Sequence, residues 1–186
     1  MQRLESALCT GEIENLEPKH FACFDAYHSG EFDQALEMAT RIFGSESHFD
    51  AKAFYLHLIC IILEIKYDLP LRAKWMSRWT TLLLDRSSPF ATAAKNYHTA
   101  VTAYFESHQL DAKSRFKNLA ENPDTPARFA ALSRFHLGLI HRNENLNGAA
   151  LIEMHKAREL AQTIGHLKLQ ARITKQITLL SKDIEF

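Results

Sequence analysis

The segment that decides the fold of this chain reads YHSGEFDQAL, from Tyr27 to Leu36. Gly30 separates two segments with apolar periodicity, and glycine suits a tight turn because it adopts positive φ without steric cost. In segment 32–43, after the glycine, apolar residues recur at helical spacing. The stretch therefore predicts an antiparallel helix hairpin that turns at Gly30.

Alanines early in amphipathic segments recur along the whole chain. They are Ala35, Ala73, Ala112 and Ala150, whose numbers show a nearly constant period. Self-similarity at a fixed period of this size indicates a helical repeat protein, in which each helix pair buries its apolar face against the next. The five prolines of the chain fall in breaks between periodic segments, so the helices are expected to be uninterrupted.

These breaks divide the chain into predicted helix pairs within a single domain of residues 1–186. The pairs span about 18–43, 50–85, 89–121 and 126–164, and a capping helix spans 166–183. A short leading helix is expected around residues 2–9, and the apolar helix that starts near Asp50 is expected to be the most buried.

Small residues tend to stand twelve positions before the repeated alanines. The four residues at that distance are Cys23, Ile61, Ala100 and Gly138, of which three are small. Small side chains let two antiparallel helices approach closely, and close approach fixes their crossing angle. Ile61 departs from this pattern in the second pair.

The turn from Tyr27 to Leu36 and the spacing of Gly138, Ala150, Met154 and Ala157 resemble the tetratricopeptide repeat. The resemblance covers roughly residues 18–182. It implies an all-α, right-handed solenoid of about four antiparallel helix pairs with a C-terminal capping helix. The period between the alanines is slightly longer than the one usual for that family, and Pro70 stands where the family tends to place an aromatic residue. The second pair is therefore a divergent one.

In such a stack the first helix of each pair lines a concave surface. Counting back fifteen, eleven and eight positions from each alanine selects one helical face. The predicted groove residues are His20, Phe24, Tyr27, Leu58, Ile62, Ile65, Tyr97, Val101, Tyr104, Phe135, Leu139 and Arg142. Ten of the twelve are apolar or aromatic, so the groove would hold a helical or apolar segment of a partner protein. The alternative is that many of these side chains pack between neighbouring pairs or against the last helix.

The charges of the chain sum to zero but are unevenly distributed. Residues 1–50 carry three basic and ten acidic side chains, a net charge of −7, and the remainder carries +7. This asymmetry argues against a uniformly basic nucleic-acid binder and is compatible with a homo-oligomer whose acidic repeat docks on a neighbour. Trp75 and Trp79, interleaved with Arg72, Lys74 and Arg78, are interpreted as core anchors opposite solvated basic residues, rather than as an aromatic and basic patch for nucleic acid.

No motif in the sequence indicates chemistry or a membrane anchor. The ten histidines lack zinc-protease spacing, no phosphate loop or nucleophile elbow occurs, and no metal or cofactor is expected. Cys9, Cys23 and Cys60 form no C-x-x-C pair and lie among apolar neighbours, as buried thiols of a reducing compartment do. The longest apolar run, 53–63, is too short to span a membrane. We therefore expect a cytoplasmic, non-enzymatic adaptor or chaperone. The alternatives are a regulatory oligomerisation module of a signalling or transcription pathway and an enzyme whose site is assembled from distant residues.

Overall fold

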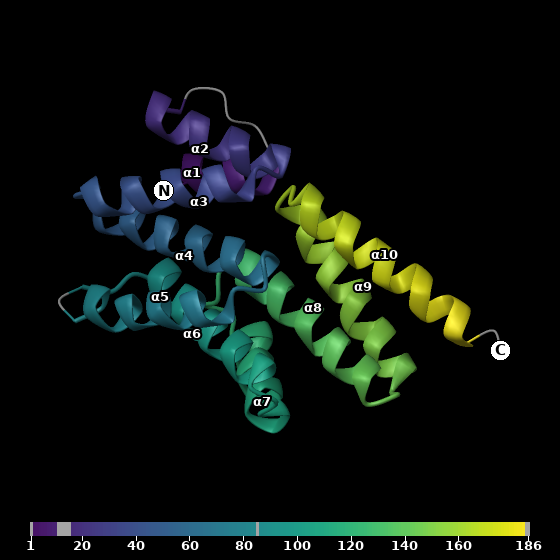
Figure 1. The fold of residues 1–186 in the computed structure, drawn as a ribbon. Coiled ribbons are helices and arrows are strands. Elements are labelled where there is room, and N and C mark those ends of the chain that lie inside the picture. The colour runs from purple at the N-terminus through teal and green to yellow at the C-terminus, as the bar shows by residue number, and fades with distance from the viewer. Residues whose placement is uncertain (1, 11–15, 85, 185–186) are drawn as a thin grey trace. The chain divides into compact units, whose positions relative to one another are not determined.

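The computed structural model describes residues 2–10, 16–84 and 86–184, and within these ranges every regular element is a helix (Figure 1). The all-α prediction is thus confirmed for the described residues. The chain divides into two compact units, Met1–His98 and Thr99–Phe186, and the boundary falls inside the sixth helix. The prediction of a single domain stays a prediction.

The first unit contains five complete helices and the start of a sixth. They are α1 (Gln2–Thr10), α2 (Pro18–Ser29), α3 (Phe32–Ser45), α4 (Phe49–Ile65), α5 (Leu69–Leu82) and the beginning of α6 (Pro89–Phe105). From α2 to α5, each helix packs against the next one in the chain. As expected, α4 is the most buried helix of this unit, because apolar residues surround nearly its whole circumference.

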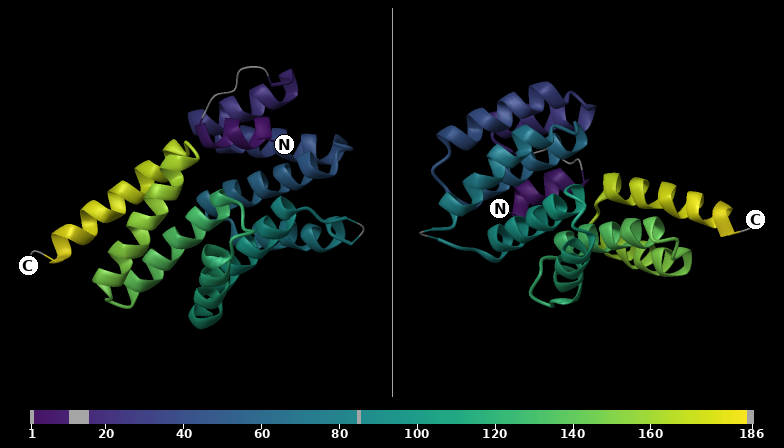
Figure 2. Two further views of the ribbon diagram at one scale, coloured as in Figure 1. Left: turned by 180° about the vertical axis from the view of Figure 1, so that it is seen from behind. Right: turned by 60° about the horizontal axis from the view of Figure 1, so that its bottom comes forward.

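The second unit repeats this consecutive packing. After the end of α6 it contains α7 (Gln109–Glu121), α8 (Ala127–Asn143), α9 (Asn147–Thr163) and α10 (Leu167–Ile184). Within it, α7 packs on α8, α8 on α9, and α10 on α9 and on the edge of α8 (Figure 2). The helices of the described residues start and end within a few residues of their predicted bounds. The proline signals explain this agreement: Pro18 and Pro89 open α2 and α6, and Pro70 lies in the first turn of α5.

Five of the turns share one backbone geometry. Each has a residue with left-handed φ between 59° and 85°, and these residues are Gly30, Tyr67, Ser107, Asn145 and Gly165. In each turn, the N–H of the following residue donates to the carbonyl oxygen five positions earlier, at 2.8 to 3.0 Å. This is the Schellman arrangement, which satisfies the last carbonyls of a helix and reverses the chain. The predicted turn at Gly30 is confirmed, and the other four repeat it.

The recurring turn fixes which residues are equivalent in the successive pairs. The residue after each left-handed position caps the next helix, and its carbonyl accepts a bond from the N–H four residues later. Those donors are Ala35, Arg72, Ala112, Ala150 and Gln170. The second pair is therefore aligned on Arg72, which is 2% exposed, and the assignment of Ala73 as the repeated alanine is wrong because Ala73 is exposed.

This register also removes the exception in the series of small residues. Twelve positions before Arg72 stands Cys60, which is fully buried like Cys23, Ala100 and Gly138, whereas Ile61 is half-buried. All four pairs thus have a small residue at this point of the first helix. The second helix approaches it closely in two pairs. Cys23 Sγ donates to the carbonyl oxygen of Ala35 at 3.7 Å, and a Cβ atom added to Gly138 would lie 2.8 Å from Met154 Cε.

The thiols and tryptophans largely follow the sequence analysis. Cys23 and Cys60 are buried free thiols, and burial raises the pKa of each to about 12. The side chain of Cys9 lies outside the described residues. Trp79 is fully buried, as predicted for a core anchor, and Trp75 is half-buried with its ring edge-on to Phe43 at 5.4 Å.

Candidate functional site

Most of the predicted groove residues belong to the core. Those with buried side chains are His20, Phe24, Tyr27, Leu58, Ile62, Tyr97, Val101 and Phe135. Tyr104, Leu139 and Arg142 are half-buried, and Ile65 is 43% exposed. When the second pair is aligned on Arg72, as the turns require, its predicted groove positions move back by one residue. They are then His57, Ile61 and Glu64 instead of Leu58, Ile62 and Ile65. His57 is buried, and the other two are half-buried. Whether any of these residues binds a partner stays a prediction.

In the first unit, the groove residues of α2 pack on aromatic residues of α4. The ring of Phe24 lies edge-on to Phe54 at 5.6 Å, and the ring of His20 stacks on Tyr55 at 5.5 Å. The hydroxyl of Tyr55 and Nδ1 of His20 also form a hydrogen bond of 2.5 Å. The pKa of Tyr55 is strongly raised by burial, which keeps the phenol protonated. An aromatic layer therefore joins α2 and α4, which are the first helices of the first two pairs.

The leading helix α1 packs on the two helices that carry this layer. It contacts both α2 and α4, and Figure 2 shows it as the purple helix beside them. Leu4, Ala7 and Leu8 are its buried side chains. One hydrogen bond of 2.9 Å joins the carbonyl oxygen of Ala7 to Nε2 of His28, next to the groove residue Tyr27. The chain's own first helix thus packs on α2 and α4, two of the helices that carry predicted groove residues.

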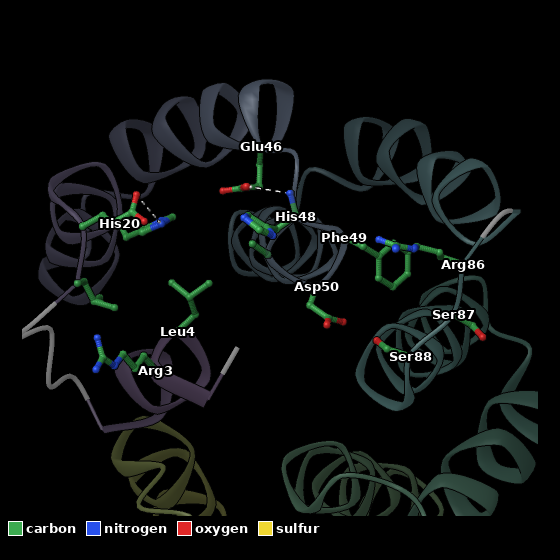
Figure 3. A pocket seen from close by; sticks show the side chains of 13 residues that line it. Arg3, Leu4, His20, Glu46, His48, Phe49, Asp50, Arg86, Ser87 and Ser88 are labelled. Atoms are coloured by element: carbon green, nitrogen blue, oxygen red, sulfur yellow. Dashed lines mark hydrogen bonds and ion pairs between the residues drawn. The ribbon is translucent and has the colours of Figure 1, made fainter.

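A cavity of about 680 Å³ lies beside α1 within the first unit (Figure 3). Its walls are the starts of α2, α4 and α6 together with Arg3 and Leu4 of α1. The volume lies in the range of sites that bind small molecules or side chains. Glu46 at its rim accepts the backbone N–H groups of His48 and Ser47, at 3.0 and 2.9 Å, and these bonds hold the pKa of its carboxyl below the usual range.

We expect His20 to make the stability of the first unit dependent on pH. Burial first and the nearby Lys19 second lower the pKa of His20. The unfolded chain therefore binds a proton more tightly than the folded one, and folding free energy is lost as the pH falls through about 6.5. Replacing His20 with phenylalanine keeps a ring on Tyr55 and removes the titration. We expect the free energy of unfolding of this variant to change less between pH 7.5 and 5.5 than that of the wild type. The difference is at most about 1.4 kcal/mol per pH unit.

Urea denaturation followed by circular dichroism at several pH values measures this difference. Parallel pH dependences of the two proteins would show that His20 does not titrate on unfolding.

A second polar cluster is fully enclosed between α4, α5 and the start of α6. The guanidinium of Arg72 donates to Nδ1 and to the carbonyl oxygen of His98, at 3.2 and 3.1 Å. His98 Nε2 lies 2.8 Å from Nδ1 of His57. Because arginine only donates, His98 accepts through Nδ1 and donates from Nε2, so His57 carries its proton on Nε2. All three side chains are at most 2% exposed.

This cluster explains why an arginine is tolerated at the position held by alanine in the first, third and fourth pairs. The imidazole and the carbonyl of His98 supply acceptors for a charge that the core would otherwise exclude, and His57 orients that imidazole. The prediction that Arg72 is a solvated basic residue is therefore wrong, whereas Lys74 and Arg78 are exposed as expected. The cluster serves packing rather than binding, because its three side chains are shielded from solvent.

In the second unit, three groove residues remain partly accessible. Tyr104 near the end of α6 lies edge-on to His136 at 5.9 Å and accepts a hydrogen bond from Asn143 at 3.3 Å. Arg142, on α8 like Leu139, donates to Gln176 of α10 at 2.9 Å. An aromatic, an aliphatic and a cationic side chain thus lie on the first helices of consecutive pairs. We call Tyr104, Leu139 and Arg142 the α6–α8 wall.

Comparison with known proteins gives no functional assignment. No family model matches the chain, and no curated protein shows significant similarity to it. Among the described residues, no helix combines the length and apolarity needed to cross a bilayer. The same residues contain no group of three or more histidine, cysteine or acidic side chains placed to hold a metal ion.

Sequence reasoning predicted the leading helix but not its packing on α2 and α4, and it missed the cluster at Arg72. The apolar spacing of Leu4, Ala7 and Leu8 indicates an amphipathic helix but does not indicate where it packs. One local feature of the sequence indicates that Arg72 occupies the position of the repeated alanines. Asp68 caps α5 by accepting the N–H of Leu71 at 3.1 Å, and counting from a cap at Asp68 aligns Arg72 with the repeated alanines.

Proposed function

We propose that this chain is a non-enzymatic protein-binding module built as a tetratricopeptide-like, right-handed solenoid. It acts as an adaptor or chaperone that holds a helical or apolar segment of another protein along the first helices of its pairs. The observation that carries the proposal is the α6–α8 wall. Tyrosine and arginine are among the residue types that contribute most to protein interfaces, and here Tyr104 and Arg142 are half-buried rather than buried, as is Leu139.

The recurring turn and the small residues at the helix contacts support the repeat architecture. The buried thiols of Cys23 and Cys60 suit the reducing cytoplasm, which we propose as the compartment. The large share of the predicted groove that is buried limits the binding surface to the α6–α8 wall and to the face that α1 covers.

The test is the double replacement Tyr104→Ala with Leu139→Ala. Removing two central contacts should weaken partner capture by about 2 kcal/mol or more, which is roughly 30-fold in affinity. Affinity capture from the cytosol of the source cells, quantified by mass spectrometry, measures the loss. The control is Leu110→Ala with Ile152→Ala, which trims two exposed apolar side chains of the second helices α7 and α9. Capture that is unchanged in the folded test variant would reject the wall as a binding surface.

A second candidate function is regulatory self-association, favoured by the charge asymmetry of the chain. An acidic surface within residues 1–50 would dock on the basic remainder of another copy. Exposed charges are screened beyond about 10 Å at 0.1 M salt, so such an oligomer should dissociate as salt is raised. Light scattering at about 0.05 and 0.5 M salt tests it, and a monomer under both conditions rejects it.

A further inference from the structure

The leading helix α1, which packs on α2 and α4, indicates what kind of partner the first unit fits. Leu4, Ala7 and Leu8 follow the spacing i, i+3, i+4, so one face of α1 is apolar. Leu4 borders the same cavity as His20, and Ala7 is bonded to His28. The helix therefore lies against the side of α2 that carries the predicted groove residues. We call this surface the α1 seat.

Among its described residues, α1 is held in its seat by one narrow apolar face and by a bond to His28. The helix has nine residues, and an isolated helix of that length is unstable in water. Its helical state is therefore supported by packing, in which the described buried side chains and the bond to His28 take part. A helix this short can be replaced by a longer helix that makes more contacts.

The seat is also larger than its occupant. A nine-residue helix is about 13 Å long, and the cavity of about 680 Å³ remains open beside it, between Leu4 and the starts of α4 and α6. Asp50 borders this cavity, and its Oδ1 atom is shielded from solvent and accepts no hydrogen bond from the described residues. A longer helix could extend into this space and offer a donor to Asp50.

From these observations we infer that the α1 seat is a helix-docking site and that α1 is its resident, displaceable occupant. The partner is an amphipathic helix from another protein. It carries leucine or alanine at i, i+3 and i+4 and continues for at least one further turn with a polar donor. This inference deepens the proposed function, because it assigns a second binding surface whose access is controlled by the chain itself.

The experiment releases α1 in the full chain and offers a helix in trans. Leu8→Glu places a charge on the buried face of α1, and Ser6→Glu adds the same charge on its exposed face as a control. The probes are a peptide of residues 2–10 with blocked ends and a peptide of twice that length that continues the same apolar spacing. Shifts in the backbone amide NMR spectrum of the ¹⁵N-labelled chain report weak binding residue by residue.

We expect the short peptide to shift the amides around His28 and Tyr55 in Leu8→Glu but not in the wild type or in Ser6→Glu. The longer peptide should bind Leu8→Glu at least tenfold more tightly and should also compete with α1 in the wild type. A folded Leu8→Glu chain that binds neither peptide would overturn the inference.

Two further outcomes would also overturn it. One is equal binding of the peptides to the wild type and to Leu8→Glu, because that binding would not involve the seat. The other is loss of the folded spectrum of the first unit in both Leu8→Glu and the milder Leu8→Ser, because α1 would then be an integral part of the core. Neither outcome bears on the α6–α8 wall, which the alanine variants test separately.

Discussion

Ala112→Arg is expected to unfold the second unit, whereas Ala73→Arg should leave the stability of the chain unchanged within about 0.5 kcal/mol. Ala112 is fully buried at the start of α7, and an arginine there would bring an unpaired charge into the core. Such a change costs about 4 kcal/mol or more. Ala73 is exposed, so an arginine at that position reaches solvent.

Comparing these two variants tests the alignment of the second pair. Both residues are alanines early in a second helix, but only Ala112 occupies the repeated, buried position. Urea denaturation monitored by circular dichroism gives the free energy of unfolding of each variant. If Ala73→Arg were as damaging as Ala112→Arg, the second pair would be aligned on Ala73 rather than on Arg72.

Gly138→Leu is expected to lower the free energy of unfolding of the second unit by about 3 kcal/mol or more. A Cβ atom at this position would already lie 2.8 and 2.9 Å from two side-chain atoms of Met154. The methionine can yield to a single methyl group because its side chain is flexible. A whole leucine side chain would force α8 and α9 apart.

The matched control is Gly148→Leu in the first turn of α9, where an added Cβ meets no atom within 4 Å. Leucine has the higher helix propensity, so this variant should be as stable as the wild type or slightly more stable. Thermal and urea denaturation of both variants measures the difference. Equal stability of the two would mean that close approach at Gly138 is not needed for the packing of α8 on α9.

The sequence was sufficient to predict the helices because their boundaries depend on local chemistry. Pro18 and Pro89 begin helices, and Gly30 and Gly165 end them in the left-handed conformation that glycine adopts most readily. These signals act over a few residues, so a single sequence contains them. The solenoid implied by the tetratricopeptide resemblance depends on how helix pairs stack, which such signals do not determine.

The register of the second pair was missed because Ala73 and Arg72 are adjacent and only one of them resembles its counterparts. Periodicity favours the alanine, whereas the structure places the arginine in the core, bonded to His98. That contact joins residues 26 positions apart, and no local pattern predicts it. The small residue Cys60 was the available clue, because it restores the series of small residues once Arg72 is chosen.

The spacing of the alanines was enough to select the predicted groove residues, but it could not predict which of them are exposed to solvent. Counting back from the alanines selects one face of each first helix, but whether that face meets solvent depends on what else packs there. In the first unit α1 packs on α2 and α4, and Phe24 and Tyr27 are buried. In the second unit Tyr104 and Leu139 stay partly open. Burial of this kind is a tertiary property, which periodicity does not reveal.

We propose that the accessible side chains of the first helices hold another protein. Site-specific photo-crosslinking in the source cells can detect such a partner, with a photoreactive amino acid in place of Leu139 and, as a control, in place of the exposed Ile152 on α9. We predict a discrete covalent adduct with another protein from position 139, lost when Tyr104 is also replaced by alanine, and none from position 152. Adducts of equal yield from both positions, or no adduct from position 139, would contradict the claim.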